Sequence, residues 1–127
     1  MAKGTLGSYT HALLRIVIGF TFSLHGFQKL FGAFGGTHAH MLSLMWFAGV
    51  LECFGGILIV LGLFTRPVAF LLCGEMAVAY FKQHAVKGFW PILNGGELAV
   101  IYCFVFLYLV YAGSGPLSLD REVRKKS

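Results

Sequence analysis

The chain has 127 residues, of which 57% are hydrophobic and only 12% are charged. Soluble domains carry about a quarter charged residues, and so short a chain has too little volume to bury several helices on every side, so this composition argues against a soluble helical protein. The formal net charge of +5 is not gathered on one soluble face, which argues against nucleic-acid binding. We therefore expect an all-α integral membrane protein that contacts the lipid bilayer.

Four apolar segments follow one another along the chain, and each approaches the roughly 20 residues that a helix needs to cross a bilayer. The expected helices cover about residues 9–34, 41–64, 67–86 and 94–112. A glycine-rich loop over 32–40 joins the first two, and only a tight turn at 65–67 separates the second from the third. These features predict a single membrane domain, residues 1–127, folded as a bundle of four transmembrane helices.

The distribution of basic residues predicts the orientation of this bundle. Lys3, Arg66 and the tail over 117–127 fall on one side of the membrane, whereas Lys29 and Lys82 approach the other side. Because basic residues are retained in the cytoplasm, we expect both chain ends to lie there (N-in, C-in), with a basic cytoplasmic tail attracted to anionic lipids.

Ionisable side chains occur in every expected helix, although each one costs at least about 2.5 kcal/mol near the centre of a bilayer. They are Arg15, His25, Lys29, Glu52, Glu75 and Glu97. In the second helix Gly49 and Gly56 share a side with Glu52, so this carboxylate is expected in a groove of small residues where another helix approaches closely. Each helix thus has a face that is suited to meet the others.

The rise of 1.5 Å per residue in a helix gives the expected depth of these groups. Glu97 enters the membrane from the same side as His25 and Lys29, so we expect these three to be partners. Glu75 is expected about 13 Å from the cytoplasmic turn, within reach of the long side chain of Arg15. These pairings depend on helix rotations that spacing alone does not specify.

Two hypotheses account for the intramembrane charges. Either they only hold the helices in register, or they line a polar pocket for a ligand or a proton; three carboxylates exceed what packing four helices requires, which favours the pocket. The candidate ligand-binding residues are Arg15, His25, Lys29, Glu52 and Glu97, with Glu75 and Tyr108 as further candidates. We expect no metal site, because the loop residues His38 and His40 offer only two ligands.

The three cysteines, Cys53, Cys73 and Cys103, lie in three different apolar segments and form no C-x-x-C motif. We expect them to pack as small buried hydrophobic side chains. The lack of C-x-x-C also argues against a protein that works alone as a disulfide-forming dithiol oxidase.

Several motifs, in this order, resemble the DoxX family of small bacterial membrane proteins. They are LRIVIG at 14–19, HGFQKLF at 25–31, Glu52 with the glycines at 55–56, LGLFTRP at 61–67, NGGELA at 94–99 and GSGPLSLD at 113–120. The resemblance covers nearly the whole chain. It implies a four-helix bundle in a bacterial inner membrane, with Arg15, Lys29, Glu52 and Glu97 as characteristic polar positions. Some members resemble subunits of thiosulfate:quinone oxidoreductases, and others belong to membrane complexes that handle oxidative or thiol stress.

The first functional hypothesis is therefore a quinone-linked membrane subunit of a redox complex. His25, Lys29, Glu52 and Glu97 would supply hydrogen-bond donors and protons, and Phe22, Phe104 and Tyr108 would line the slot for the ring. No haem, flavin or nucleotide motif is present, so electrons would come from a partner.

The alternative hypothesis is a non-catalytic membrane anchor or accessory subunit that binds a protein partner or forms a homo-oligomer. A carrier is disfavoured because four helices without an inverted repeat provide a poor basis for alternating access. The sequence leaves open whether turnover occurs on this chain.

Overall fold

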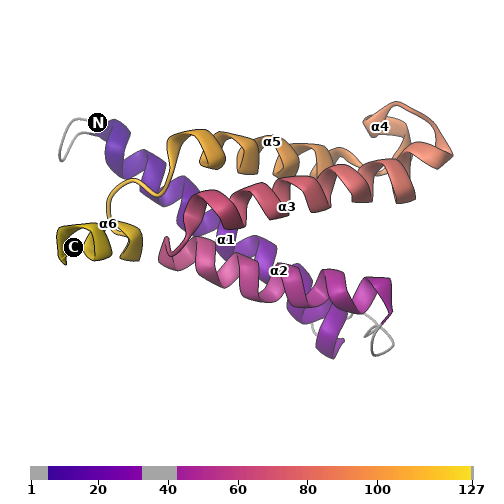
Figure 1. The fold of residues 1–127 in the computed structure, drawn as a ribbon. Coiled ribbons are helices and arrows are strands. Elements are labelled where there is room, and N and C mark those ends of the chain that lie inside the picture. The colour runs from indigo at the N-terminus through magenta and orange to yellow at the C-terminus, as the bar shows by residue number, and fades with distance from the viewer. Residues whose placement is uncertain (1–5, 33–42, 127) are drawn as a thin grey trace.

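The computed structural model describes residues 6–32 and 43–126, and within these ranges all the regular elements are helices (Figure 1). Their bounds are α1 Leu6–Phe31, α2 Leu44–Leu61, α3 Thr65–Ala79, the π-helix η2 Tyr80–His84, the 3₁₀-helix η3 Ala85–Lys87, α4 Pro91–Asn94, α5 Glu97–Ala112 and α6 Leu119–Lys126. The all-helical prediction is therefore confirmed for the described part of the chain. Lys3 and most of the glycine-rich loop, including His38 and His40, lie outside that part.

The helices of the second half differ in detail from the expected segments. The α-helical part of the segment 67–86 ends at Ala79 and continues as η2 and η3. The segment 94–112 is interrupted because Gly95 adopts the left-handed conformation, with φ of 75°, which ends α4 before α5 begins at Glu97. The tail, which we expected only as a basic segment, folds as the helix α6.

Local signals in the sequence define both ends of α2. At the start, the hydroxyl of Ser43 accepts a hydrogen bond of 3.1 Å from the backbone nitrogen of Trp46. At the end, Gly62 is left-handed, with φ of 68°, and its N–H donates to the carbonyl of Ile59. The chain therefore turns directly from α2 into α3.

Glycines allow α1 and α2 to pack closely along each other (Figure 1). A Cβ atom on Gly26 would lie 2.6 Å from the Cα of Cys53, and a Cβ on Gly56 would lie 2.8 Å from the carbonyl oxygen of Gly19. Since no side chain fits at such distances, the two backbones come closer than larger residues would permit. The groove of small residues predicted beside Glu52 is thus confirmed.

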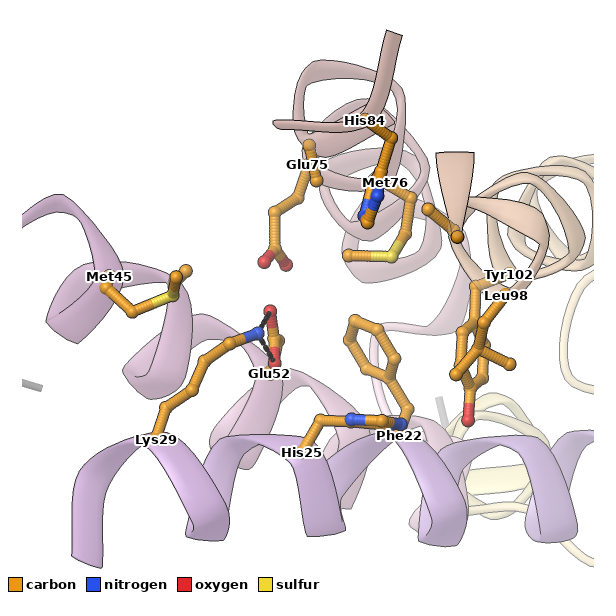
Figure 2. A pocket seen from close by; sticks show the side chains of 14 residues that line it. Phe22, His25, Lys29, Met45, Glu52, Glu75, Met76, His84, Leu98 and Tyr102 are labelled. Atoms are coloured by element: carbon orange, nitrogen blue, oxygen red, sulfur yellow. Dashed lines mark hydrogen bonds and ion pairs between the residues drawn. The ribbon is translucent and has the colours of Figure 1, made fainter. Parts of the chain in front are cut away.

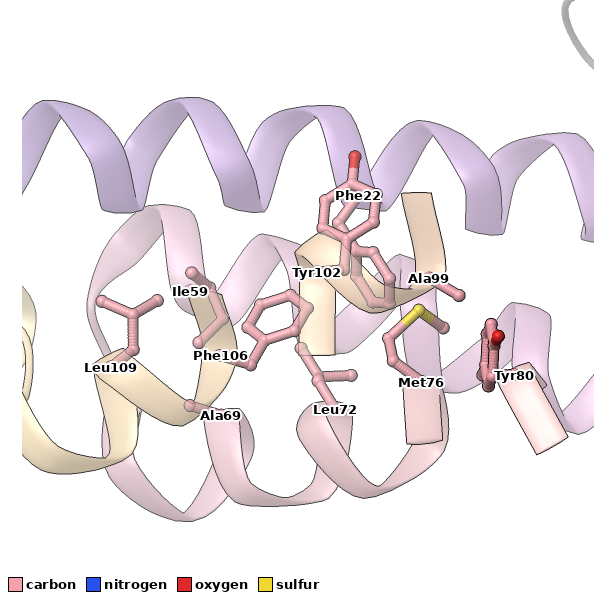
Figure 3. Packing of buried hydrophobic residues seen from close by; sticks show 10 residues of the cluster. All are labelled: Phe22, Ile59, Ala69, Leu72, Met76, Tyr80, Ala99, Tyr102, Phe106 and Leu109. Atoms are coloured by element: carbon pink, nitrogen blue, oxygen red, sulfur yellow. The ribbon is translucent and has the colours of Figure 1, made fainter. Parts of the chain in front are cut away.

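The buried core lies mainly between α3 and α5, and α1 and α2 each add a side chain to it (Figure 3). Its members are Phe22, Ile59, Ala69, Leu72, Met76, Tyr80, Ala99, Tyr102, Phe106 and Leu109. The ring of Phe22 makes edge-to-face contacts with Tyr102 and Phe106, with centroids 4.9 Å apart in both pairs. These aromatic contacts join the α1–α2 pair to the α3–α5 pair.

Large apolar side chains also cover the outside of the bundle. Phe20, Phe54, Phe70 and Phe104 are each more than half exposed in the isolated chain. In the described ranges, α2 is the one helix that combines the length and the hydropathy of a bilayer span, whereas α5 is apolar but shorter. An apolar surface of this extent requires a partner other than water.

Candidate functional site

A cavity of about 260 Å³ opens where α1, α2, α3 and α5 meet (Figure 2). It lies toward the end of α3 and α5 that carries α4 (Figure 1). Its lining combines charged groups with apolar walls. The lining residues are Phe22, His25, Lys29, Met45, Ala48, Glu52, Glu75, Met76, Ala79, His84, Gly95, Leu98, Ala99 and Tyr102. The volume lies just below the range of about 300–1,000 Å³ that is usual for drug-sized ligands, so the cavity suits a small ligand or the head group of a larger one.

An ion pair between α1 and α2 forms one wall of this cavity. The ammonium nitrogen of Lys29 lies 2.6 Å from each carboxylate oxygen of Glu52 and donates to both. Glu52 is 1% exposed, whereas the Lys29 side chain keeps 27% of its surface accessible. The close approach depends on Gly49, because a Cβ there would lie 3.0 Å from the Cβ of Lys29. The small-residue groove thus brings the two charges together.

Glu75 adds a second carboxylate from α3. In Figure 2 it points toward Glu52, and it interacts electrostatically with both Glu52 and Lys29. Its Oε1 atom is buried and has no hydrogen-bond partner among the described residues. Two carboxylates therefore face a single ammonium group, and one of their oxygens is free to bond to a ligand or to hold a proton.

Histidines lie on two sides of the cavity. His25 precedes Lys29 by one helical turn and lies edge-to-face with Tyr102, with ring centroids 5.9 Å apart. His84 belongs to the π-helix η2 and packs beside Tyr80. Short π-helical segments often occur at functional sites, because they reorient a side chain that a regular helix would point elsewhere.

Arg15 lies at the other end of the bundle and does not line this cavity. Its guanidinium group is completely buried and donates hydrogen bonds only to backbone carbonyls. The acceptors are Ile59 and Val60 at the end of α2, and Ser114, Pro116 and Leu117 in the segment before α6. The cation therefore adds hydrogen bonds at the C-terminal end of α2, where the helix dipole favours a positive charge, and joins it to the non-helical segment before α6. Its arrangement is structural, and the expected contact between Arg15 and Glu75 does not occur.

Asp120 completes this second polar cluster. Its carboxylate accepts hydrogen bonds from the backbone nitrogens of Phe64, at 2.7 Å, and Thr65, at 2.9 Å, so it caps the start of α3. Its own backbone nitrogen donates to the carbonyl of Gly62 at 2.9 Å. α6 is therefore held against the turn between α2 and α3.

Two other sequence candidates also lie apart from the cavity. Glu97 is exposed in the first turn of α5, where a carboxylate is favoured by the helix dipole, and it does not contact His25 or Lys29. Tyr108 forms a hydrogen bond of 3.0 Å with Nδ1 of His11, whose Nε2 donates to the carbonyl of Gly113 at 2.9 Å. Phe104, expected in the slot for a ring, is 63% exposed on the outside of α5.

Sequence reasoning placed His25, Lys29, Glu52 and Glu75 among the candidates, and these four line the cavity together. It missed the further lining residues Met45, Met76 and His84. Met76 is one turn along α3 from Leu72 and Cys73, a spacing that could have placed it on the inner face. Nothing in the sequence could have revealed His84, because its position depends on the π-helix.

Comparisons with known proteins give relatives for most of the chain. A family model described as DoxX matches residues 10–85. A protein of Haemophilus influenzae (strain Rd), named only "Uncharacterized protein", is 48% identical over 93% of both chains. "Inner membrane protein YphA" of Escherichia coli K12 is 34% identical over 87% of both chains, and "Putative oxidoreductase CatD" of Bacillus subtilis 168 is 29% identical over 89% of this chain and 86% of its own. No solved structure matches the chain significantly.

Proposed function

The chain belongs to the DoxX family of membrane proteins, and from this premise we propose that it is the membrane subunit of a quinone-linked redox complex. In this proposal α1, α2, α3 with η2, and α5 all cross a bacterial inner membrane, and both chain ends lie in the cytoplasm. The exposed apolar side chains on these helices support the four spans, and the basic residues Arg66 and Arg121 at one end of the bundle support the orientation.

The observation that carries the proposal is the cavity in which Lys29, Glu52, Glu75 and His25 face an apolar wall. A quinone needs a slot for its flat ring, hydrogen-bond donors for its two carbonyls and a source of protons. The apolar wall of this cavity beside Lys29, His25 and two carboxylates supports the assignment (Figure 2). A cluster that served only to join helices would require neither the open volume nor a carboxylate oxygen without a partner.

The lining residues suggest how the tasks are divided. The ring would lie between Phe22, Met76 and Tyr102, whose side chains form the apolar wall. Lys29 and His25 would donate to a carbonyl, and Glu75 would exchange the proton that the reduced ring requires. The cavity has room for the head group alone, so the isoprenoid tail would extend between the helices into the lipid.

Electrons would reach this subunit from a protein partner, since the chain has no recognisable motif for a redox cofactor of its own. The name of the B. subtilis relative, an oxidoreductase, supports the redox assignment. Thiosulfate or thiol-stress chemistry, which the family resemblance implies, would then belong to the complex as a whole. A second copy of the chain is the other partner that this proposal allows.

Arg15 supports an alternative proposal, a non-catalytic anchor or accessory subunit. It is the most deeply buried charge among the described residues, and the hydrogen bonds of its guanidinium group connect segments of the backbone. If the ion pair between Lys29 and Glu52 also served only to join helices, the role of the protein would be to fix the geometry of a larger complex.

Quinone binding by the protein in lipid nanodiscs distinguishes the two proposals. We expect a short-chain ubiquinone or menaquinone analogue to bind the wild type and to bind at least tenfold more weakly after Glu52→Gln or Glu75→Gln. Glu97→Gln serves as the control, because Glu97 is exposed and outside the cavity. Equal affinity for the wild type and both folded cavity variants would contradict the redox proposal and favour the anchor.

A further inference from the structure

Two cysteines that are 30 residues apart in the sequence meet between α3 and α5. The sulfur of Cys73 lies 3.7 Å from the sulfur of Cys103, and both side chains are half-buried. A disulfide bond requires a sulfur separation of about 2.05 Å, so the two sulfur atoms would have to approach each other by about 1.7 Å. The pair is thus poised to be oxidised.

The cysteine pair lies between the lipid-facing surface and the cavity. Phe70 and Leu107, which share helix faces with Cys73 and Cys103, are 67% and 50% exposed, so the thiols border the lipid-facing surface. In the other direction, Met76 follows Cys73 by one turn and Ala99 precedes Cys103 by one turn. Both of these residues line the cavity. The thiols therefore lie about 5 Å along the helix axes from the proposed quinone site.

We propose that Cys73 and Cys103 form a redox-active dithiol that passes two electrons to a membrane quinone. This inference rests on the proposed function for its oxidant. The absence of a C-x-x-C motif does not count against it, because the two thiols come together through helix packing and not through sequence spacing. The protein would then contribute its own electron-carrying group to the complex.

The reaction balances with these groups alone. Both S–H bonds break, and one S–S bond forms between the two sulfurs. The two electrons reduce one quinone, and the two protons end on its carbonyl oxygens, which become the hydroxyls of the quinol. A dithiol of the partner protein would reduce the disulfide again by two successive thiol–disulfide exchanges. Its own two sulfurs would end as a disulfide, and Cys73 and Cys103 would return to free thiols.

Cys53 offers an internal control within the same chain. It is 3% exposed, lies on α2 against the backbone of Gly26, and has no sulfur partner within the described residues. The proposal requires Cys53 to stay reduced while the other two react together. Because burial alone would also protect Cys53, the disulfide between Cys73 and Cys103 and the quinol formed with it are what distinguish the proposed reaction from nonspecific oxidation.

The test uses the reduced full-length protein in nanodiscs, to which decylubiquinone is added without oxygen. We expect alkylation and peptide mass spectrometry to find a Cys73–Cys103 disulfide, a free thiol at Cys53 and one quinol for each disulfide formed. Cys73→Ser and Cys103→Ser should each abolish quinol formation. Quinone binding is measured in the same samples.

The outcomes separate the two proposals. If the wild type binds quinone but keeps three free thiols, the dithiol inference is overturned and the proposed function stands. If the disulfide and the quinol form, although no quinone is retained and Glu52→Gln reacts at the same rate, the inference stands and the cavity assignment fails. Oxidation of Cys53 to the same extent as the pair would also overturn the inference.

Discussion

The ammonium group of Lys29 donates to both carboxylate oxygens of Glu52 at 2.6 Å, and this contact joins α1 to α2 beside an open cavity. Breaking a buried ion pair is costly because the remaining partner keeps an uncompensated charge in a medium of low dielectric constant. We therefore expect Lys29→Met to destabilise the protein by roughly 3 kcal/mol, measured as reversible unfolding in mixed micelles.

The matched control for this change is Lys82→Met, because Lys82 is exposed on η2 and lies outside the cavity. We expect its effect to stay within about 0.5 kcal/mol. The double variant Lys29→Met, Glu52→Leu should recover part of the lost stability, since it removes the second charge as well. An additive loss in the double variant would show that the ion pair does not form.

Among the described glycines of α1, Gly26 is the one whose added Cβ would lie nearest to the backbone of α2. A methyl group there would meet the backbone of Cys53, with its Cα at 2.6 Å, so Gly26→Ala must force the helices apart. We expect a loss of at least about 2 kcal/mol in stability, together with weaker quinone binding because Lys29 moves away from Glu52.

Gly74→Ala is the control for this substitution. Gly74 lies in α3 with no atom within 4 Å of the added methyl group, so the exchange should be neutral or stabilise the helix by up to about 1 kcal/mol. If both substitutions had the same effect, the close packing of α1 on α2 would be contradicted.

Asp120 holds α6 against the α2–α3 turn through two backbone hydrogen bonds. Asp120→Ala should remove this cap and release the tail, at a cost of about 1–2 kcal/mol. Hydrogen exchange of residues 119–126 should rise, while exchange in α2 stays the same. Asp120→Asn should retain most of the protection, because an amide oxygen also caps a helix; complete loss in this variant would indicate that the negative charge near Arg15 dominates.

The predictions from the sequence agree with the structure for features that depend on helix formation and on the size of neighbouring residues. The apolar segments, the glycine groove beside Glu52 and the tight turn before α3 all follow from patterns of nearby residues. Contacts between distant helices depend on how each helix is rotated about its axis, and packing sets that rotation. For this reason Glu75 meets Glu52 and not Arg15.

The break at Gly95 explains why Glu97 does not lie beside Lys29, as the sequence predicted. The expectation treated residues 94–112 as one continuous helix, in which Asn94 and Glu97 share a stripe. The left-handed conformation of Gly95 separates α4 from α5 and changes that register. Spacing also could not bring Cys73 to Cys103, because their contact depends on α3 packing against α5.

Glu75 offers the sharpest separation between a structural and a functional role. Its side chain forms a hydrogen bond with Glu52, but its Oε1 atom is buried without a hydrogen-bond partner among the residues that the structure describes, and the cost of burying that atom offsets what the bond contributes. We expect Glu75→Leu to leave the free energy of unfolding unchanged or to raise it by up to about 1 kcal/mol, because an apolar side chain removes the cost of burying that atom. The same variant should bind a quinone analogue at least tenfold more weakly. Both quantities can be measured on one nanodisc preparation, and a loss of stability with normal quinone binding would identify Glu75 as a residue that only joins the helices.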